Sequence, residues 1–363
     1  MLYPAGMSVS DVQEPWIDAL LAWFDPEARP MPWRALRTPY RVWISETMLQ
    51  QTQVATVIPY FERFMARFPD ARALAAAPLE DVLKSWEGLG YYSRARALHR
   101  CAGIVVARHG GELPASHAAL LELPGIGPYT AGAIASLAFG LPHPAVDGNV
   151  LRVTSRLWAS LEPVDHPRTR ERVTSRLASV MPDREPGRFN EALMELGATV
   201  CTPRNPRCEG CPLASHCLAF QAGAVSRFPV RAPRRKPRFA TFEVAVLEAP
   251  GPRYLVMRRP DGGLLGGLWE FPTREISADE TPLPEGPASG PSVPPRIFEA
   301  LAPWQELAHA FTHIRATYRV GRARVLEVSD LDAEDVRWVT DTELTRLPLG
   351  KVHQLIRSRL LDA

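Results

Sequence analysis

The pattern of apolar residues is helical in the first part of the chain and strand-like after Phe239. In Pro78–Trp86 and Arg94–His109, apolar residues recur every three to four positions, with capping residues and Gly breaks between such segments. The first 220 residues are therefore predicted to be all-α. The second part is predicted to form a sheet followed by a C-terminal helix over Leu344–Leu360, because it holds short β-branched runs between turn signals: Phe242–Leu247, Tyr254–Met257, Ala316–Val320 and Arg324–Val328.

The chain is long enough for two domains. It has 363 residues, about twice a common domain length, and its 46% hydrophobic content can fill real cores. No apolar run of about 18 residues or more suggests a membrane span. We expect a helical domain over 1–221, a linker over 222–237 and an α+β domain over 238–363. Between Ile276 and Pro295 the chain holds six prolines, and a mobile surface loop is expected there.

The net charge of +2 is too small to indicate nucleic-acid binding by itself, but the linker concentrates positive charge. Its basic residues alternate with prolines and no acid interrupts them: Arg227, Arg231, Arg234, Arg235, Lys236 and Arg238. Such an extended segment can follow phosphates, or it can be a merely solvated spacer.

Four of the five cysteines lie close together, as Cys201-x6-Cys208-x2-Cys211-x5-Cys217. Four soft sulfur ligands suit an iron–sulfur cluster or zinc, and the single Cys-x2-Cys pair separates these two only weakly. Disulfides are disfavoured because residues 1–15 lack the features of a signal peptide. A reducing, cytoplasmic location is therefore expected.

A second motif, Leu123-Pro-Gly-Ile-Gly-Pro-Tyr-Thr130, is predicted to be a tight hairpin between two helices. Gly125 and Gly127 permit the turn, and backbone N–H groups exposed at the next helix N-terminus can bind a phosphate. A Gly-x-Gly sequence alone is most often just a turn. Here the motif indicates a functional site because the segment Ala145–Arg152, about 20 residues later, carries Asp147 and Asn149.

The hairpin, the aspartate after it and the four-cysteine loop resemble the endonuclease III superfamily of DNA glycosylases. Within that superfamily, Trp43–Gln53 and Gly88–Arg94 are similar to the MutY family of adenine glycosylases. The resemblance runs from about Pro15 to Gln221 and continues into the second domain. It implies a helix–hairpin–helix fold and a [4Fe–4S] cluster, rather than zinc, on the four cysteines. It also implies a base-excision enzyme that acts on duplex DNA as a monomer, bacterial and associated with the nucleoid.

Two carboxylates fit the chemistry that this resemblance implies. Removing adenine needs an acid for the departing base and an anion for the oxocarbenium-like sugar. Glu46 lies in an apolar segment, where desolvation would raise its pKa, and Asp147 lies where helix N-termini would keep it ionised. By similarity Glu46 is the acid, Asp147 stabilises the cation, and Asn149 and Tyr129 position Asp147 and water. From the sequence alone, Glu46 could equally be a capping glutamate and Asp147 a plain N-cap.

Tyr129 also separates subclasses of the superfamily. Bifunctional relatives carry a lysine at this position, which attacks the sugar and leads to strand cleavage through a Schiff base. The nearest lysines here are Lys84 and Lys236, so hydrolysis without strand cleavage is predicted.

The target nucleotide must leave the stack before these groups can reach it. By the family match, Gln51 and Tyr91 wedge into the duplex beside the opposite base, whereas Tyr92 could equally be a core aromatic. The match also places Trp33, Arg34 and Glu191 around the adenine, although Trp33 could serve plain core packing.

The second half resembles a Nudix-type domain, most clearly in Leu265–Pro272. A Nudix hydrolase needs a glutamate-rich helix for magnesium, and only Thr273–Ile276 follows before the Pro-rich segment, so no hydrolase activity is predicted. In the family this domain reads 8-oxoguanine opposite the adenine through Phe-Ser-His. The chain has Phe311-Thr312-His313, which keeps the hydroxyl but adds a methyl group.

The predicted function is excision of adenine opposite 8-oxoguanine or guanine. Three alternatives belong to other classes: a non-catalytic cluster-bearing DNA-binding protein, a pyrimidine glycosylase with lyase activity, and a nucleotide diphosphatase. The first is disfavoured by the joint presence of Glu46 and Asp147, the second by Tyr129 and the third by the missing glutamate helix.

Overall fold

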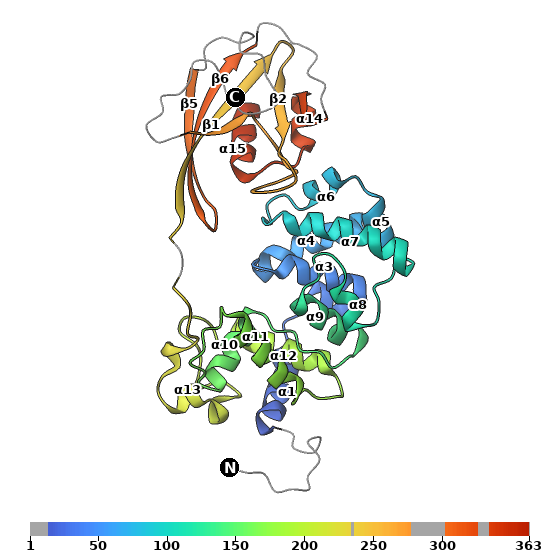
Figure 1. Ribbon diagram of the computed structural model, residues 1–363, viewed down its shortest axis with the longest axis vertical. Coiled ribbons are helices and arrows are strands. Elements are labelled where there is room, and N and C mark those ends of the chain that lie inside the picture. Colours follow the sequence, from blue (N-terminus) through green and yellow to red (C-terminus); the bar gives the residue numbers. More distant parts are fainter. Residues whose placement is uncertain (1–13, 234–235, 277–301, 326–333, 363) are drawn as a thin grey trace. The chain divides into compact units, whose positions relative to one another are not determined.

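The computed structural model describes residues 14–233, 236–276, 302–325 and 334–362, which divide between two compact units (Figure 1). The helical unit comprises Met1–Ala76 and Arg100–Pro233, and the sheet unit comprises Ala77–His99 and Arg234–Ala363. The Pro-rich segment after Ile276 lies outside the described residues. The domain boundaries at 221 and 237 stay a prediction.

The described part of the helical unit contains helices and loops and no strand, as the periodicity predicts. Its helices are α1 (Pro15–Glu27), α2 (Pro32–Ala35), α3 (Pro39–Leu49), α4 (Val54–Arg67), α5 (Ala71–Ala76), α8 (His117–Leu121), α9 (Pro128–Phe139), α10 (Gly148–Leu157), α11 (Pro167–Ala178), α12 (Pro186–Thr199) and α13 (Leu218–Gln221). Helix α7 (Ser93–His109) begins in the sheet unit and ends in this one.

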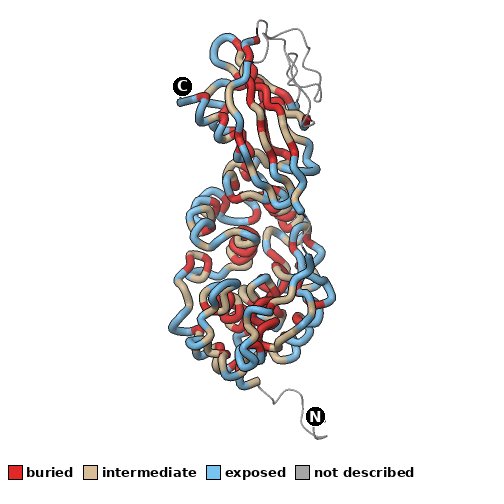
Figure 2. Tube along the Cα trace, turned by 90° about the vertical axis from the view of Figure 1, so that its left-hand side faces the viewer, coloured by how far each residue is buried: buried red, intermediate tan, exposed pale blue. Residues whose placement is uncertain are grey.

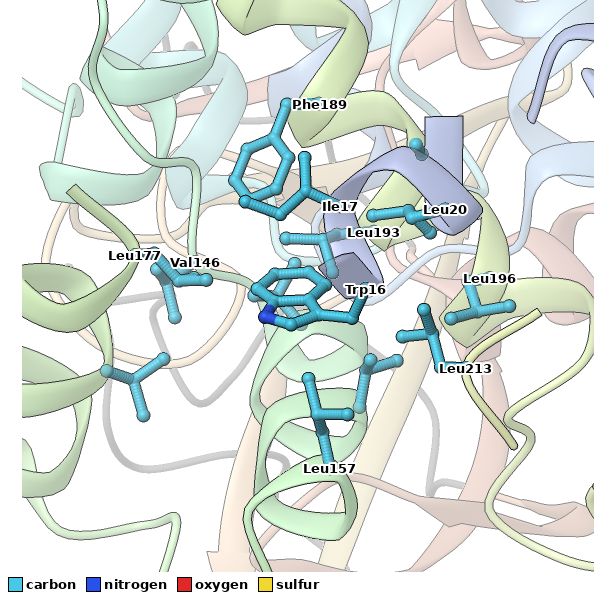
Figure 3. Close-up of a cluster of buried hydrophobic side chains, with 14 of the residues drawn as sticks. Trp16, Ile17, Leu20, Val146, Leu157, Leu177, Phe189, Leu193, Leu196 and Leu213 are labelled. Carbon is cyan, nitrogen blue, oxygen red and sulfur yellow. The ribbon is translucent and has the colours of Figure 1, made fainter. Parts of the chain in front are cut away.

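Helix α1 anchors one part of the helical core. Pro15 suits the first helical turn, where its missing N–H costs nothing, and Trp16, Leu20 and Phe24 then recur on one face. Figure 3 shows this face against α12, where the Trp16 and Phe189 rings have centroids 5.9 Å apart. Each such buried side chain contributes about 1.5–3 kcal/mol of transfer free energy, so this packing holds α12 firmly in place.

Two glycines allow the chain to pass closely at the start of α10. A Cβ on Gly132, in α9, would collide with the Pro144 carbonyl in the segment that leads to Asp147. A Cβ on Gly197, in α12, would stand 2.6 Å from the Cβ of Asn149. Glycine at both positions therefore lets α9 and α12 hold the segment around Asp147 at backbone distance.

The sheet unit is built on a mixed seven-stranded sheet, and its strands are β1 (Arg238–Ala249), β2 (Arg253–Arg258), β3 (Trp269–Glu270), β4 (Thr273–Ile276), β5 (Ala302–Ala310), β6 (Ile314–Arg324) and β7 (Val336–Thr340). The strand order is β3-β2-β1-β6-β5, with β4 paired to β1 and β7 to β2. Only β1 and β6 pair in parallel among the described strands. Figure 2 shows long buried stretches in these strands.

The C-terminal helix differs from the prediction. The structure has two helices, α14 (Asp341–Arg346) and α15 (Lys351–Leu361), where one helix over Leu344–Leu360 was expected. Pro348 interrupts the pattern because it lacks an N–H, and Gly350 caps the second helix. Both helices bury apolar side chains in the core of the sheet, among them Leu344, Val352 and Ile356.

The remaining differences concern strands. Strands β3, β4, β5 and β7 were not predicted, and the run beginning at Ala316 is longer than predicted, since β6 continues to Arg324. Residues beyond Val325 in the predicted strand Arg324–Val328 lie outside the described part of the chain.

The segment Ala77–His99 joins the sheet unit through polar contacts. It includes α6 (Leu79–Ser85), whose Glu80 accepts hydrogen bonds from Trp269 at 3.1 Å and from Arg337 at 2.9 Å. Glu87 accepts one from the Leu349 N–H at 3.0 Å. Within the described ranges, no helix has the length and hydropathy needed to cross a bilayer.

Candidate active site

Glu46 lies inside α3 with only 4% of its surface exposed, so it is not a capping residue. Burial raises the pKa of this carboxyl to about 7, and the charges of Asp147 and Glu191 add to the effect. The hydrogen bond from Tyr129 and the charge of Arg34 oppose it. A carboxyl with this pKa carries a proton in part of the population at neutral pH, as a general acid must.

Tyr129, in the first turn of α9, donates a short hydrogen bond to Glu46 Oε2. Burial and the nearby carboxylates hold the Tyr129 pKa well above its ordinary value, so the phenol keeps its proton and remains the donor. The structure therefore joins Tyr129 to Glu46 directly, whereas the sequence argument had attached it to Asp147 and water.

Asp147 is the N-cap of α10 and also belongs to a wider polar arrangement. Its Oδ1 accepts from the Val150 N–H at 2.8 Å, and its Oδ2 accepts from Asn149 Nδ2 at 2.7 Å. Burial raises the pKa of Asp147, and these hydrogen bonds lower it. The donors are those expected at a helix N-terminus, but burial outweighs them, so the pKa of Asp147 is raised and not lowered as the sequence predicted.

Arg152 supports Asn149, a role that the sequence did not predict. Its Nη2 donates to Asn149 Oδ1 at 2.8 Å and to the Gly197 carbonyl at 2.7 Å. Its Nε donates to the Cys201 carbonyl at 2.7 Å. Arg152 thus fixes which end of the Asn149 amide faces Asp147, and its position three residues after Asn149 on α10 was the available signal.

Arg34 and Glu191 form the centre of a buried ion-pair network. Arg34 Nε lies 3.0 Å from Glu191 Oε1, and its Nη2 lies 3.0 Å from Glu195 Oε2. Arg37 Nη2 lies 2.7 Å from Glu191 Oε2. Glu195 and Arg37 were not foreseen, because nothing local in the sequence shows that α2 and α12 meet.

Trp33 is buried in α2, and its ring meets Phe61 edge-on at a centroid distance of 5.4 Å. This contact is core packing. A role for Trp33 beside the adenine stays a prediction.

The predicted hairpin forms as expected between α8 and α9. Gly125 has φ of +83°, which a glycine adopts without strain, and Gly127 precedes Pro128 at the start of α9. No side-chain hydrogen bond caps this N-terminus, so no side chain competes with an anion for its first N–H groups.

The two predicted wedge residues share an unusual backbone conformation. Gln51 has φ of +59° and Tyr91 has φ of +49°, which is uncommon for residues other than glycine, and both side chains are exposed. Tyr92 is buried, and its hydroxyl accepts from the Gly88 N–H at 3.2 Å. Tyr92 is therefore a core aromatic.

The predicted reader Phe311-Thr312-His313 forms the turn between β5 and β6. Phe311 is partly buried against the core, whereas Thr312 and His313 are exposed. The Thr312 hydroxyl lies 3.1 Å from the Tyr91 hydroxyl within the sheet unit. The structure thus brings together two residues that are 221 positions apart and that the sequence assigned separately to the opposite base.

The four clustered cysteines line one small cavity of about 30 Å³, together with apolar side chains. All four are free thiols, so disulfides are absent among them. Burial, with a smaller contribution from the neighbouring thiols, raises the pKa of Cys211 to about 11. A positively charged group is needed to hold four thiolates so close together, and Arg156, which donates to Cys201 Sγ at 3.3 Å, supplies only part of that charge.

The donor set fits an iron–sulfur cluster, because four cysteines and mostly apolar side chains line this one cavity. Ligation by four cysteine thiolates is what such clusters use.

Family models match three parts of the chain. Residues 44–184 match the HhH-GPD superfamily of base excision DNA repair proteins, and residues 201–217 match the iron–sulfur binding domain of endonuclease III. Residues 243–359 match the NUDIX domain. The fold expected from the sequence, helical and then Nudix-like, is confirmed, as is an iron–sulfur cluster in place of zinc.

Similar proteins are named as DNA glycosylases. The chain is 39% identical to the adenine DNA glycosylase of Mus musculus over 83% of its own length and 69% of the relative. A thermostable thymine-DNA glycosylase has a similar structure, with TM-score 0.54 and 27% identity over 58% of this chain and 97% of that one. A trapped endonuclease III–DNA covalent intermediate gives TM-score 0.51 and 25% identity over 60% and 99%.

Proposed function

The chain belongs to the adenine DNA glycosylase family, and we propose that it removes adenine paired with 8-oxoguanine or guanine by hydrolysis that leaves the strand unbroken. As a member of this family it is a base-excision repair enzyme with an iron–sulfur cluster. The choice of mispair, the chemical steps and the residues below are our proposal.

The observation that carries the proposal is the buried carboxyl of Glu46, bonded to Tyr129, together with the partly buried carboxylate of Asp147. Glu46, with a pKa near 7, donates its proton to the adenine ring as the glycosidic bond breaks. Asp147, held in place by Asn149 and Val150, faces the cationic sugar and stabilises it. Water then completes the reaction at the sugar, directly or after a short-lived ester with Asp147.

The unit that contains both carboxyls contains no lysine. The lysines of the chain are Lys84, Lys236 and Lys351, and all three belong to the sheet unit. Tyr129 occupies the place of the lysine that forms a Schiff base in bifunctional relatives, and its phenol is engaged with Glu46. These facts support a monofunctional enzyme.

The remaining site residues contact different parts of the DNA in this proposal. We propose that Gly125 and Gly127 present N–H groups to a phosphate, and that Gln51 and Tyr91 fill the gap in the duplex. Arg34, Glu191 and Trp33 surround the flipped base. Contacts to the phosphates position the duplex, and contacts to the bases select the target pair.

The opposite base is read in the sheet unit. We propose that Phe311, Thr312 and His313 contact 8-oxoguanine and that Cys201, Cys208, Cys211 and Cys217 ligate the cluster. All of these groups belong to one chain, which supports a monomer. Its substrate, chromosomal DNA, supports a place at the bacterial nucleoid in the cytoplasm.

One assay tests the whole proposal. Duplexes with adenine opposite 8-oxoguanine, adenine opposite guanine, or thymine glycol are incubated with the protein, and half of each sample is treated with alkali. Breaks should appear only after alkali and only in the two adenine duplexes. Efficient trapping of the unaltered protein on DNA by borohydride would instead identify a lyase.

A further inference from the structure

A polar cleft of about 510 Å³ opens beside Glu191 in the helical unit and has no role in the chemistry above. It lies between the end of α1, the α2–α3 turn and the first turns of α12. Its volume falls in the range of about 300–1,000 Å³ typical of small-molecule sites. Its lining residues include both signs of charge: Phe24, Asp25, Arg37, Glu185, Arg188 and Glu191.

Glu191 connects this cleft with the catalytic carboxyl. The side chain lines the cleft, and its charge is close enough to raise the pKa of Glu46. Its Oε1 accepts from Arg34 and its Oε2 from Arg37. Glu191, which the family match places beside the adenine, is therefore also a lining residue of the cleft, and two guanidinium groups hold its carboxylate there.

The two arginines differ in how firmly they are held. Arg34 is 14% exposed and donates to Glu191, Glu195 and the Arg29 carbonyl. Arg37 is 38% exposed, and its described hydrogen bond goes to Glu191 alone. Turning Arg37 toward solvent breaks one partly exposed ion pair, whereas moving Arg34 would break ion pairs with two buried carboxylates, Glu191 and Glu195.

The opposite lip of the cleft is held by contacts that do not involve Arg34 or Arg37. Arg188 Nε donates to Asp25 Oδ1 at 2.9 Å, which joins α12 to the end of α1. The lip can therefore stay in place while Arg37 moves.

We propose that this cleft is the exit by which the excised purine base leaves while the product duplex is still bound, and that Arg37 is its gate. This inference rests on the proposed function. The nucleotide enters from the DNA side, and the abasic strand then covers that entrance, so the free base needs a second opening. The exocyclic amine of adenine can donate to Glu191 Oε2 in place of Arg37, and no bond is made or broken on the way.

Exchange of free adenine with a DNA-bound enzyme tests the exit directly. The full-length protein is saturated with a duplex that carries a non-cleavable tetrahydrofuran site opposite 8-oxoguanine, and association and dissociation of radiolabelled adenine are measured. Arg37→Ala should accelerate both rates several-fold and leave their ratio, the Kd, nearly unchanged.

Matched variants make the result specific. Arg172→Ala removes another partly exposed arginine of the helical unit, one that pairs with Glu162 far along the sequence from the cleft residues, and should leave both rates as they are. Arg37→Lys keeps the charge and should shift the rates less than Arg37→Ala.

Several results would overturn the exit. One is that adenine binds the free protein but not the DNA complex, and another is that adenine does not bind at all. The third is that Arg37→Ala changes the Kd of adenine without changing its association and dissociation rates. Excision of adenine from the 8-oxoguanine duplex is measured separately on the unaltered enzyme. A normal excision rate with unaffected exchange refutes the exit alone, whereas absent excision refutes the proposed function.

Discussion

Asn149 donates a 2.7 Å hydrogen bond to the carboxylate of Asp147, two residues before it at the start of α10. The other end of the Asn149 amide accepts from Arg152, so the amide cannot turn over without losing both contacts. Asp147 is therefore an oriented anion as well as a helix cap. This distinction gives the first prediction.

Asp147→Asn should reduce base excision by about 10²–10³-fold, because the charge that stabilises the cationic sugar is lost. Asparagine still caps helices well, so the free energy of unfolding should change little. Single-turnover rates and thermal unfolding on the same preparations check both statements. If the variant lost stability but kept its single-turnover excision rate, Asp147 would act only as a helix cap.

Glu46→Gln should reduce excision by about 10²–10⁴-fold, since the general acid is removed. In the unaltered enzyme the rate should fall as the pH rises through about 7, where Glu46 loses its proton. Tyr129→Phe removes a hydrogen bond that lowers this pKa, so the same decline should move to higher pH. A pH profile of single-turnover rates for the three proteins distinguishes this account from a purely structural role.

The same residue predicts a pH dependence of stability. The pKa of Glu46 is raised from 4.5 to about 7 on folding, so the folded state binds the proton more tightly. Its favourable contribution is complete below the unfolded pKa and is lost as the pH rises through about 7. Glu46→Gln should therefore gain stability relative to the unaltered protein at pH 8 and not at pH 4, as thermal unfolding can show.

Gly197→Ala should slow excision and lower the free energy of unfolding by about 1–3 kcal/mol, because the added methyl group would displace Asn149. Gly103→Ala is the matched control. Gly103 is also helical, but a Cβ there meets nothing within 4 Å, so alanine should be neutral or stabilising. Equal effects of the two substitutions would contradict the close approach of α12 and α10.

Serine at any of the four clustered cysteines should lower the iron content and weaken DNA binding. Cys101→Ser provides the comparison, since Cys101 is fully buried on α7 and is separate from the cluster loop. It should retain the yellow-brown colour that sulfur-to-iron charge transfer gives, even if the buried hydroxyl reduces stability. Iron and sulfide analysis with visible absorption separates the two cases, and zinc without iron would refute the assignment.

Thr312→Val should reduce the preference for 8-oxoguanine over guanine, because it removes the hydroxyl that also meets Tyr91. Thr312→Ser keeps the hydroxyl and should preserve the preference. The quantity to measure is the ratio of excision rates on the two duplexes, since affinity can fall for both. An unchanged ratio in Thr312→Val would mean that other residues read the opposite base. Truncation near Arg235 is a less specific test, because it also removes the partners of Glu80 and Glu87.

The sequence by itself determined the features that depend on short-range pattern. The spacing of Cys201 to Cys217, the glycines of the hairpin and the helical periodicity of α6 and α7 are all local, and each predicted feature is present. The break between α14 and α15 was also local, and Pro348 was the sign that was overlooked. Strand β5 escaped detection because most of its residues are partly or fully exposed, so it lacks a clear apolar alternation.

Only the tertiary structure decided which distant side chains act together. Arg37 meets Glu191 across 154 positions, and Tyr129 meets Glu46 across 83. Such pairs depend on how helices pack, and packing is set by the summed burial of many apolar side chains that carry no pairwise signature in the sequence. The pKa of Asp147 is a further example. The sequence showed the helix N-terminus, which lowers this pKa. The burial that raises it, and that has the larger effect, arises only when α9, α10 and α12 pack around the site.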